Sequence, residues 1–314
     1  MIKKQIAIDV GGGFLRIYEK NVGFVFSAPA SLAVEKRGKK YAIIATGEKA
    51  AQMQDENHLL VFSPIAEGTI QSVEYAAALL KRALLSLYPQ KMLGGISAFV
   101  AVPAGVSAEE KTKFLKTCAK AGLRHLDIAD STICALLGTD INPETPVLMI
   151  DLGASKCDFQ ILQNFQIQKS ATLGLGANSI QNAIIQTLWE DMDLYITTKV
   201  AKDIQNNLCS LFSSDAKSLQ IQAIHTKTKE AITKTIMAQK VHPIARGFFE
   251  EVALVAKTML EEIHPSKVEN IVFTGGLANI AGLEKFMLKH FPETQIVIPQ
   301  NPENCVIVGL SKLI

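Results

Sequence analysis

The sequence predicts an α/β protein made of two related lobes, each with a central mixed sheet and flanking helices. Two observations lead to this fold class. Short apolar runs rich in β-branched residues alternate with stretches of helical periodicity along the 314 residues. In addition, a strand that ends in aspartate, one apolar residue and glycine occurs near the start, around Asp9, and again near the middle, around Asp151. Two copies of one motif in separate halves suggest two similar lobes that face one another.

Composition narrows the class of protein. Hydrophobic residues make up 48% and charged residues 20%, as expected for a folded globular chain. The 32 basic and 30 acidic residues give a net charge of +2, which provides no electrostatic case for a nucleic-acid partner. The five cysteines are scattered without a CxxC pair, so we expect reduced thiols and a cytoplasmic location. We expect neither a signal peptide nor a membrane span, while peripheral membrane association stays open.

The first half opens with a strand over 6–10 that enters a glycine turn and returns over 15–18. Ser107, with Glu110 three positions later, predicts a capped helix that ends at Ala121 and is stopped by Gly122. The other elements expected here are strands at 41–45 and 96–102, a helix beginning at 46–51, and helices over 73–87 and 131–137, the last stopped by Gly138.

In the second half the pattern begins again, with a strand over 147–151 and a returning strand over 157–162. Mostly helical sequence is expected over 178–211 and 227–263. The remaining expectations are a strand over 271–273, a helix over 281–290, a short strand over 296–298 and a helical tail from Cys305.

The turns after the two aspartates have the composition of phosphate-binding turns. Small residues let backbone N–H groups approach a phosphate without obstruction. An aspartate at the end of the preceding strand can hold Mg²⁺ through water, because that ion keeps much of its hydration. A third turn, Thr274–Gly275–Gly276, lies between an apolar strand and a helix, where an adenine ring could pack on bare backbone. Each turn alone is also compatible with an ordinary connection, but three together favour a nucleotide site.

The set and order of these segments resemble the actin, sugar kinase and heat-shock chaperone ATPase superfamily, and within it the MreB bacterial actins. The glycine turns are shared by the superfamily, whereas the VPAGV segment and the C-terminal segment point to the bacterial actins. The segments that carry the resemblance are IDVGGG at 8–13, TGEKAAQM at 46–53, PIAEGTI at 64–70, VAVPAGVSAEEK at 100–111, AGLRHLDIADSTICALLG at 121–138, MIDLGASKCDFQIL at 149–162, TLGLGANSIQNAI at 172–184, IVFTGGLANIAGLEKFM at 271–287 and NPENCVIVGLSKL at 301–313.

The resemblance implies an actin-like fold with a nucleotide cleft between the lobes, holding ATP or ADP with Mg²⁺. The first lobe would comprise 1–145 and 301–314, with a small subdomain at 31–70, and the second 146–300, with a small subdomain at 180–243. Asp9 and Asp151 would lie near the metal. The positions implied to contact the nucleotide are Gly11, Gly12, Gly13 and Phe14 in the first loop, Gly153, Ala154 and Ser155 in the second, Gln205 and Asn207 near the ribose, and Thr274, Gly275, Gly276 and Leu277 at the adenosine.

The catalytic position departs from the family pattern. The family's water-positioning glutamate falls on Ser131, and the glutamate before it falls on Asp130. A serine cannot act as a general base without a partner. Asp130 could activate water from one position earlier or simply cap the helix. The sequence therefore implies at most a slow ATPase.

Three functional hypotheses follow. The first is a nucleotide-binding filament protein that serves cell shape or intracellular organisation, because the family assembles into filaments and guides cell-wall synthesis at the inner membrane. The second is a non-polymerising adaptor or pseudo-ATPase of the same fold, and the less favoured third is a small-molecule kinase, for which no aspartate base lies in a matching motif. The apolar run over 59–62 is compatible with a membrane or membrane-protein contact and equally with a buried strand.

Overall fold

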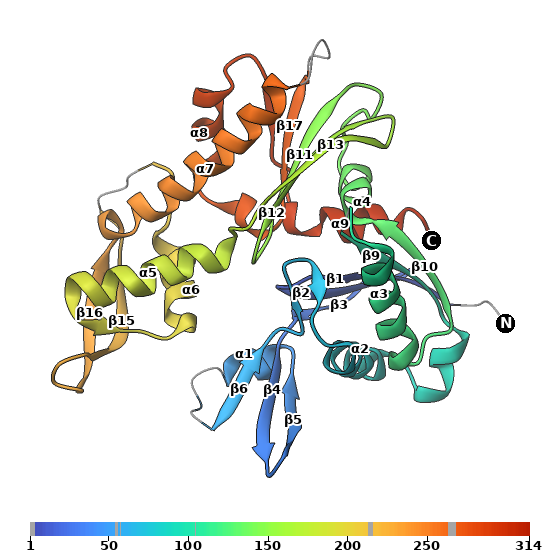
Figure 1. Cartoon of the computed structure of the whole chain (residues 1–314), viewed down its shortest axis with the longest axis horizontal. Coiled ribbons are helices and arrows are strands. Elements are labelled where there is room, and N and C mark those ends of the chain that lie inside the picture. Colours follow the sequence, from blue (N-terminus) through green and yellow to red (C-terminus); the bar gives the residue numbers. More distant parts are fainter. Residues whose placement is uncertain (1–3, 54–55, 57, 104, 213–215, 263–267) are drawn as a thin grey trace. The chain divides into compact units, whose positions relative to one another are not determined.

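The computed structural model describes residues 4–53, 56, 58–103, 105–212, 216–262 and 268–314. The chain divides into two compact units, Met1–Asn142 with Glu303–Ile314 and Pro143–Pro302 (Figure 1). Residue 104, in the predicted break after the strand at 96–102, and residue 263, in the second predicted helical stretch, lie outside the described residues. Among the described residues, no helix is long and apolar enough to cross a bilayer.

The first unit is built on a five-stranded mixed sheet with the order β10-β9-β1-β2-β3. Parallel pairing joins β1 to β9 and β9 to β10, while β1, β2 and β3 form an antiparallel meander. Side chains of β1 alternate between two cores: Ile6 and Ile8 lie in one cluster, and Ala7 lies in another. The strands are β1 (Gln5–Val10), β2 (Phe14–Glu19), β3 (Gly23–Pro29), β9 (Ser97–Val102) and β10 (His125–Asp130).

Helices α2 (Val73–Leu87) and α3 (Ala108–Ala121) contribute to the larger core of this unit, and α4 (Ser131–Leu137) and α9 (Cys305–Ser311) to the smaller. The predicted signals at α3 are confirmed, since Ser107 Oγ accepts a hydrogen bond from the Glu110 N–H at 3.2 Å and Gly122 ends the helix with φ of 112°. Helix α9 packs closely on α4: a Cβ at Gly309 would lie 1.7 Å from the Cys134 carbonyl oxygen. The C-terminal helix thus fixes the position of α4.

A smaller sheet with the order β5-β4-β6 completes the first unit, with α1 (Glu48–Gln52) beside it. Its strands are β4 (Leu32–Arg37), β5 (Lys40–Thr46) and β6 (Leu59–Phe62). The short pair β7 (Ile65–Ala66) and β8 (Thr69–Ile70) follows, and later the 3₁₀ helix η1 (Gln90–Gly95). The apolar run over 59–62 is the edge strand β6. Leu59 and Val61 pack against a small alanine cluster, whereas Leu60 is 56% exposed.

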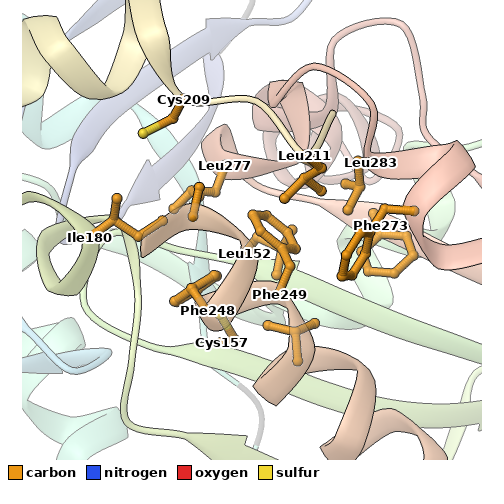
Figure 2. Close-up of a cluster of buried hydrophobic side chains, with 14 of the residues drawn as sticks. Leu152, Cys157, Ile180, Cys209, Leu211, Phe248, Phe249, Phe273, Leu277 and Leu283 are labelled. Atoms are coloured by element: carbon orange, nitrogen blue, oxygen red, sulfur yellow. The ribbon is translucent and has the colours of Figure 1, made fainter. Parts of the chain in front are cut away.

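The second unit repeats the design with a five-stranded sheet of order β13-β12-β11-β17-β18. Its core mixes strand residues with side chains of α5 and α7; Figure 2 shows Leu152 and Cys157 among Phe248 and Phe249. The elements are β11 (Val147–Leu152), β12 (Cys157–Gln163), β13 (Gln166–Leu173), α5 (Ala177–Met192), α7 (His242–Glu261), β17 (Asn270–Thr274), η3 (Gly276–Asn279), α8 (Leu283–His290), β18 (Gln295–Val297) and η4 (Pro302–Asn304).

The chain between α5 and α7 forms a three-stranded sheet of order β14-β15-β16. Helix α6 (Thr198–Leu208) contacts β15 of this sheet. Its strands are β14 (Leu194–Tyr195), β15 (Ser218–His225) and β16 (Ala231–Met237), followed by η2 (Ala238–Lys240). The expectation of mostly helical sequence over 227–263 is wrong for β16. Antiparallel pairing with β15 in a hairpin makes it a strand.

Candidate functional site

The two predicted turns are hairpins with the same closing hydrogen bond. In the first, the Gly11 N–H donates to the Phe14 carbonyl at 2.9 Å. In the second, the Gly153 N–H donates to the Lys156 carbonyl at 3.0 Å. Each hairpin joins the end of a central strand, β1 or β11, to its antiparallel neighbour. The sequence motif therefore encodes one backbone arrangement twice, once in each unit.

In the first hairpin Asp9 faces Arg16 across the β1–β2 ladder. Arg16 Nη1 lies 3.4 Å from Asp9 Oδ2, and the two side chains are only 11% and 15% exposed. The Phe14 ring lies 5.0 Å from the guanidinium carbon, within cation–π range. Burial raises the pKa of the Asp9 carboxyl above its ordinary value, and Arg16 offsets part of that rise.

Asp130 and Ser131 lie at the junction of β10 and α4, at the carboxyl end of the parallel strands. Asp130 Oδ1 accepts hydrogen bonds from the N–H groups of Thr132 at 2.9 Å and Ile133 at 3.3 Å, so this carboxylate caps α4. Burial raises the pKa of the Cys134 thiol to about 12, and the charges of Asp130 and Asp9 add to the rise. Asp9, Asp130 and Ser131 are thus grouped at one end of the sheet of the first unit.

In the second unit, Asp151 at the end of β11 pairs in register with Thr274 at the end of the parallel strand β17. The Thr274 hydroxyl donates to Asp151 Oδ1 at 3.4 Å. Gly275 has φ of 84°, and a Cβ there would come 2.6 Å from Asp151 Oδ1 and 2.5 Å from the Leu152 carbonyl oxygen. The second hairpin and the third turn therefore form one continuous surface, which requires glycine at 275.

The N-terminus of α5 holds the second loop from behind. The Ala177 N–H donates to the Gly153 carbonyl at 3.1 Å, and the Asn178 N–H donates to the Ala154 carbonyl at 2.8 Å. These two carbonyl groups occupy donors that a helix start would otherwise offer to an anion. The first N–H groups of α5 are therefore used to hold the second loop.

Lys156 and Cys157, which follow the second loop, are structural. Lys156 pairs with Asp158 at 2.7 Å with both side chains under one-fifth exposed, and the Thr172 hydroxyl also donates to Asp158 at 2.7 Å. Lys156 is therefore engaged by Asp158 rather than extended into solvent. Cys157 is fully buried, and burial raises the pKa of its thiol strongly, which argues against reactivity.

The remaining predicted nucleotide contacts are dispersed within the second unit. The Gln181 amide donates to Gln205 Oε1 at 2.8 Å, so Gln205 joins α5 to α6. Asn207 is exposed and its amide donates to the Asp203 carbonyl of its own helix at 2.8 Å. Leu277 is buried in the core, whereas Gly276 is exposed. Gln205 would have to give up its hydrogen bond with Gln181, and Asn207 its bond with the Asp203 carbonyl, before their side-chain amides could bind a ribose.

The two aspartates differ in how well they suit a magnesium ion. Asp151 beside the Thr274 hydroxyl offers the oxygen donors that Mg²⁺ prefers. Asp9 is already paired with a guanidinium, which a divalent cation would have to displace. The described residues contain no group of three or more His, Cys, Asp or Glu side chains arranged to hold a metal ion.

Arg16 is the residue of this site that the motifs do not identify. It stands outside the aspartate–glycine pattern, two positions beyond Phe14. The hairpin register could have identified it, because the length of the turn predicts that the residue at position 16 lies opposite Asp9.

Two mixed sheets, each opening with a central strand that ends in aspartate and a glycine hairpin, define a protein of the actin-like class. Similar solved structures confirm this fold. A crystal structure of MreB 5 of Spiroplasma citri bound to AMPPNP matches with a TM-score of 0.90 and 22% identity, covering 100% of this chain and 96% of that one. A MamK double helical filament matches with a TM-score of 0.82 and 20% identity, covering 99% and 98%.

The family model described as MreB/Mbl protein matches residues 3–314. The chain therefore belongs to the MreB/Mbl family of cell shape-determining, actin-like proteins, as the sequence segments suggested. It is 22% identical to the cell shape-determining protein Mbl of Bacillus subtilis (strain 168), covering 98% of this chain and 95% of the relative. It is 20% identical to MreB of Escherichia coli (strain K12), covering 99% and 93%.

Proposed function

We propose that this chain binds ATP or ADP through its two hairpin turns, assembles into filaments that serve cell shape or intracellular organisation, and hydrolyses ATP slowly or not at all. The observation that carries the proposal is the repeated hairpin: two turns with one closing hydrogen bond, each preceded by an aspartate at the end of a central strand.

The relatives support nucleotide binding and self-association. MreB5 of Spiroplasma citri has been crystallised with AMPPNP and with ADP, and MamK forms a double helical filament. In filaments of this class, a nucleotide can bias a conformational equilibrium toward the state that makes head-to-tail contacts. A cytoplasmic location, with a membrane or membrane-protein partner, fits a cell-shape role of this kind.

Weak hydrolysis follows from the chemistry at the start of α4. Ser131 lacks the basicity to activate water. Asp130 accepts two backbone N–H hydrogen bonds as a helix cap, so one of its carboxylate oxygens is already engaged by α4. Slow turnover is compatible with filaments, because hydrolysis is needed for disassembly rather than assembly.

The test measures nucleotide binding, turnover and assembly in one preparation. We expect dissociation constants that are micromolar or weaker, roughly 8 kcal/mol of binding free energy at most. Filaments should pellet and be visible by electron microscopy with nucleotide. Turnover should stay far below about one per second, the low end of ordinary enzymes.

Variants at position 131 separate the catalytic claim from the binding claim. Ser131→Ala should leave turnover unchanged, whereas Ser131→Glu should raise it if the water lies where the family places it. Turnover near one per second in the wild type, abolished in Ser131→Ala, would contradict the slow-ATPase proposal. A chain that stays monomeric at high concentration with and without nucleotide would favour the adaptor alternative.

A further inference from the structure

We infer that Arg16 is a built-in counter-cation of the first hairpin, standing at Asp9 where a divalent metal ion would otherwise be held. The ion pair itself is independent of any ligand. Its consequence for nucleotide binding rests on the proposed function.

The geometry of the pair carries the inference. Asp9 and Arg16 are directly opposed in the β1–β2 register, so their side chains leave the same face of the sheet. Nη1 lies 3.4 Å from Oδ2, and both side chains are nearly nine-tenths buried. A carboxylate that shares such a site with a guanidinium has its charge balanced by the protein, which leaves little electrostatic attraction for Mg²⁺.

One further contact shows that Arg16 is held in place rather than resting on the surface, and one of its nitrogens is left with donor capacity. The Phe14 ring lies 5.0 Å from the guanidinium carbon and so limits its movement. The Arg16 Nε is buried and has no hydrogen-bond partner among the described residues. A buried guanidinium with donor capacity beyond Asp9 is suited to share a phosphate oxygen, since its planar fork can donate in two directions.

The second hairpin lacks this arrangement. The residue opposite Asp151 is Asp158, an acid, whose counter-cation is Lys156 from the turn itself. The residue opposite the aspartate is therefore a base in the first hairpin and an acid in the second.

The experiment measures the affinity for a fluorescent ADP analogue in the presence of magnesium and in the presence of EDTA. The quantity compared is the affinity with magnesium divided by the affinity with EDTA. Asp9→Asn should leave this ratio within about twofold of the wild type, because Asp9 holds no metal. Arg16→Met should raise the ratio by about tenfold, the scale of a gained metal interaction, because Asp9 becomes free to bind the ion. Asp9→Asn combined with Arg16→Met should cancel that gain, and Arg16→Lys should match the wild type.

A second readout uses the protein without nucleotide. The concentration of free Mn²⁺ is followed by electron paramagnetic resonance as protein is added. Arg16→Met should lower it more than the wild type does. The double variant, Asp9→Asn with Arg16→Met, should behave like the wild type. Lys156→Met, which deletes a cation from the other hairpin, is the matched control and should leave Asp9-dependent binding unchanged.

The outcomes separate the two claims. Absence of nucleotide binding in every variant would overturn the proposed function, while the Mn²⁺ titration would still decide the role of Arg16. If Arg16→Met fails to fold, as judged by circular dichroism, the comparison of Asp9→Asn with wild type decides instead. Two results would overturn the inference. One is a ratio of affinities with magnesium and with EDTA that is high in the wild type and falls to about one in Asp9→Asn. The other is Mn²⁺ binding by the wild type that is lost in Asp9→Asn.

Discussion

In the first hairpin Asp9 faces an arginine across the sheet, whereas in the second Asp151 faces an aspartate and accepts a hydrogen bond from Thr274 on the neighbouring parallel strand. The closing hydrogen bonds of the two turns are the same to within 0.1 Å (2.9 and 3.0 Å). The repeated glycine and aspartate therefore set the backbone, while residues outside the motif set the charge. Likeness of motif does not imply likeness of ligand.

The largest expected effect is at Gly275, on which the second hairpin depends. Gly275→Ala should destabilise the protein by about 3 kcal/mol or abolish folding, because φ is positive and the added methyl group would meet the Leu152 carbonyl and the Asp151 carboxylate. Gly276→Ala is the control: its methyl group would meet nothing within 4 Å, so we expect a change under about 0.5 kcal/mol. Chemical denaturation measures both, and equal effects would contradict the close approach at 275.

The second-largest loss of stability is expected when the ion pair of the first hairpin is broken. Arg16→Met should cost about 3 kcal/mol at neutral pH, because it leaves the Asp9 carboxylate buried without its counter-charge. The pKa of Asp9 is already raised and should rise further in this variant. Ionised Asp9 opposes folding when its folded-state pKa exceeds the unfolded value, so the loss should shrink as the pH falls. A loss that does not depend on pH would show that packing, not charge, is the cause.

The corresponding ion pair of the second hairpin should matter less. Lys156→Met should cost about 1 kcal/mol, because Asp158 keeps the hydrogen bond from the Thr172 hydroxyl and can accept water. Unfolding curves of Lys156→Met and Arg16→Met, collected in the same buffer, test the difference directly. A larger loss in Lys156→Met would reverse the comparison between the hairpins.

The smallest effect is expected at Asp130. Asp130→Ala should cost about 1 kcal/mol through loss of the α4 cap, whereas Asp130→Asn, which caps equally well, should cost a few tenths. Neither should change ATP turnover if Asp130 serves only as a cap. A fall in turnover in Asp130→Asn at unchanged stability would instead assign it to catalysis.

The elements that the sequence predicted well are those with local signals. The helices over 73–87 and 131–137 have the expected bounds, and the helix that starts after Ser107 ends at Ala121. Polar strands were missed: β10, β13, β15 and β16 carry many polar residues and become strands through pairing with a neighbour. Their sequences alone do not distinguish them from loops or helices.

The same division applies to the candidate site. The aspartates and glycines could be identified because their turn is encoded locally and occurs twice. Arg16 could not be identified from the motif, since its importance comes from the residue opposite it in the ladder. Likewise the hydrogen bonds that engage Gln205 and Asn207 depend on how α6 packs and on its own turn geometry, which the sequence pattern does not fix.

A crystal structure of this chain with ADP would test the central claim most directly. The account predicts phosphate oxygens within hydrogen-bonding distance of backbone N–H groups in both turns, Gly11–Phe14 and Gly153–Lys156, with Arg16 still paired to Asp9. A nucleotide bound away from these turns, or a metal ion on Asp9 with Arg16 displaced, would contradict it.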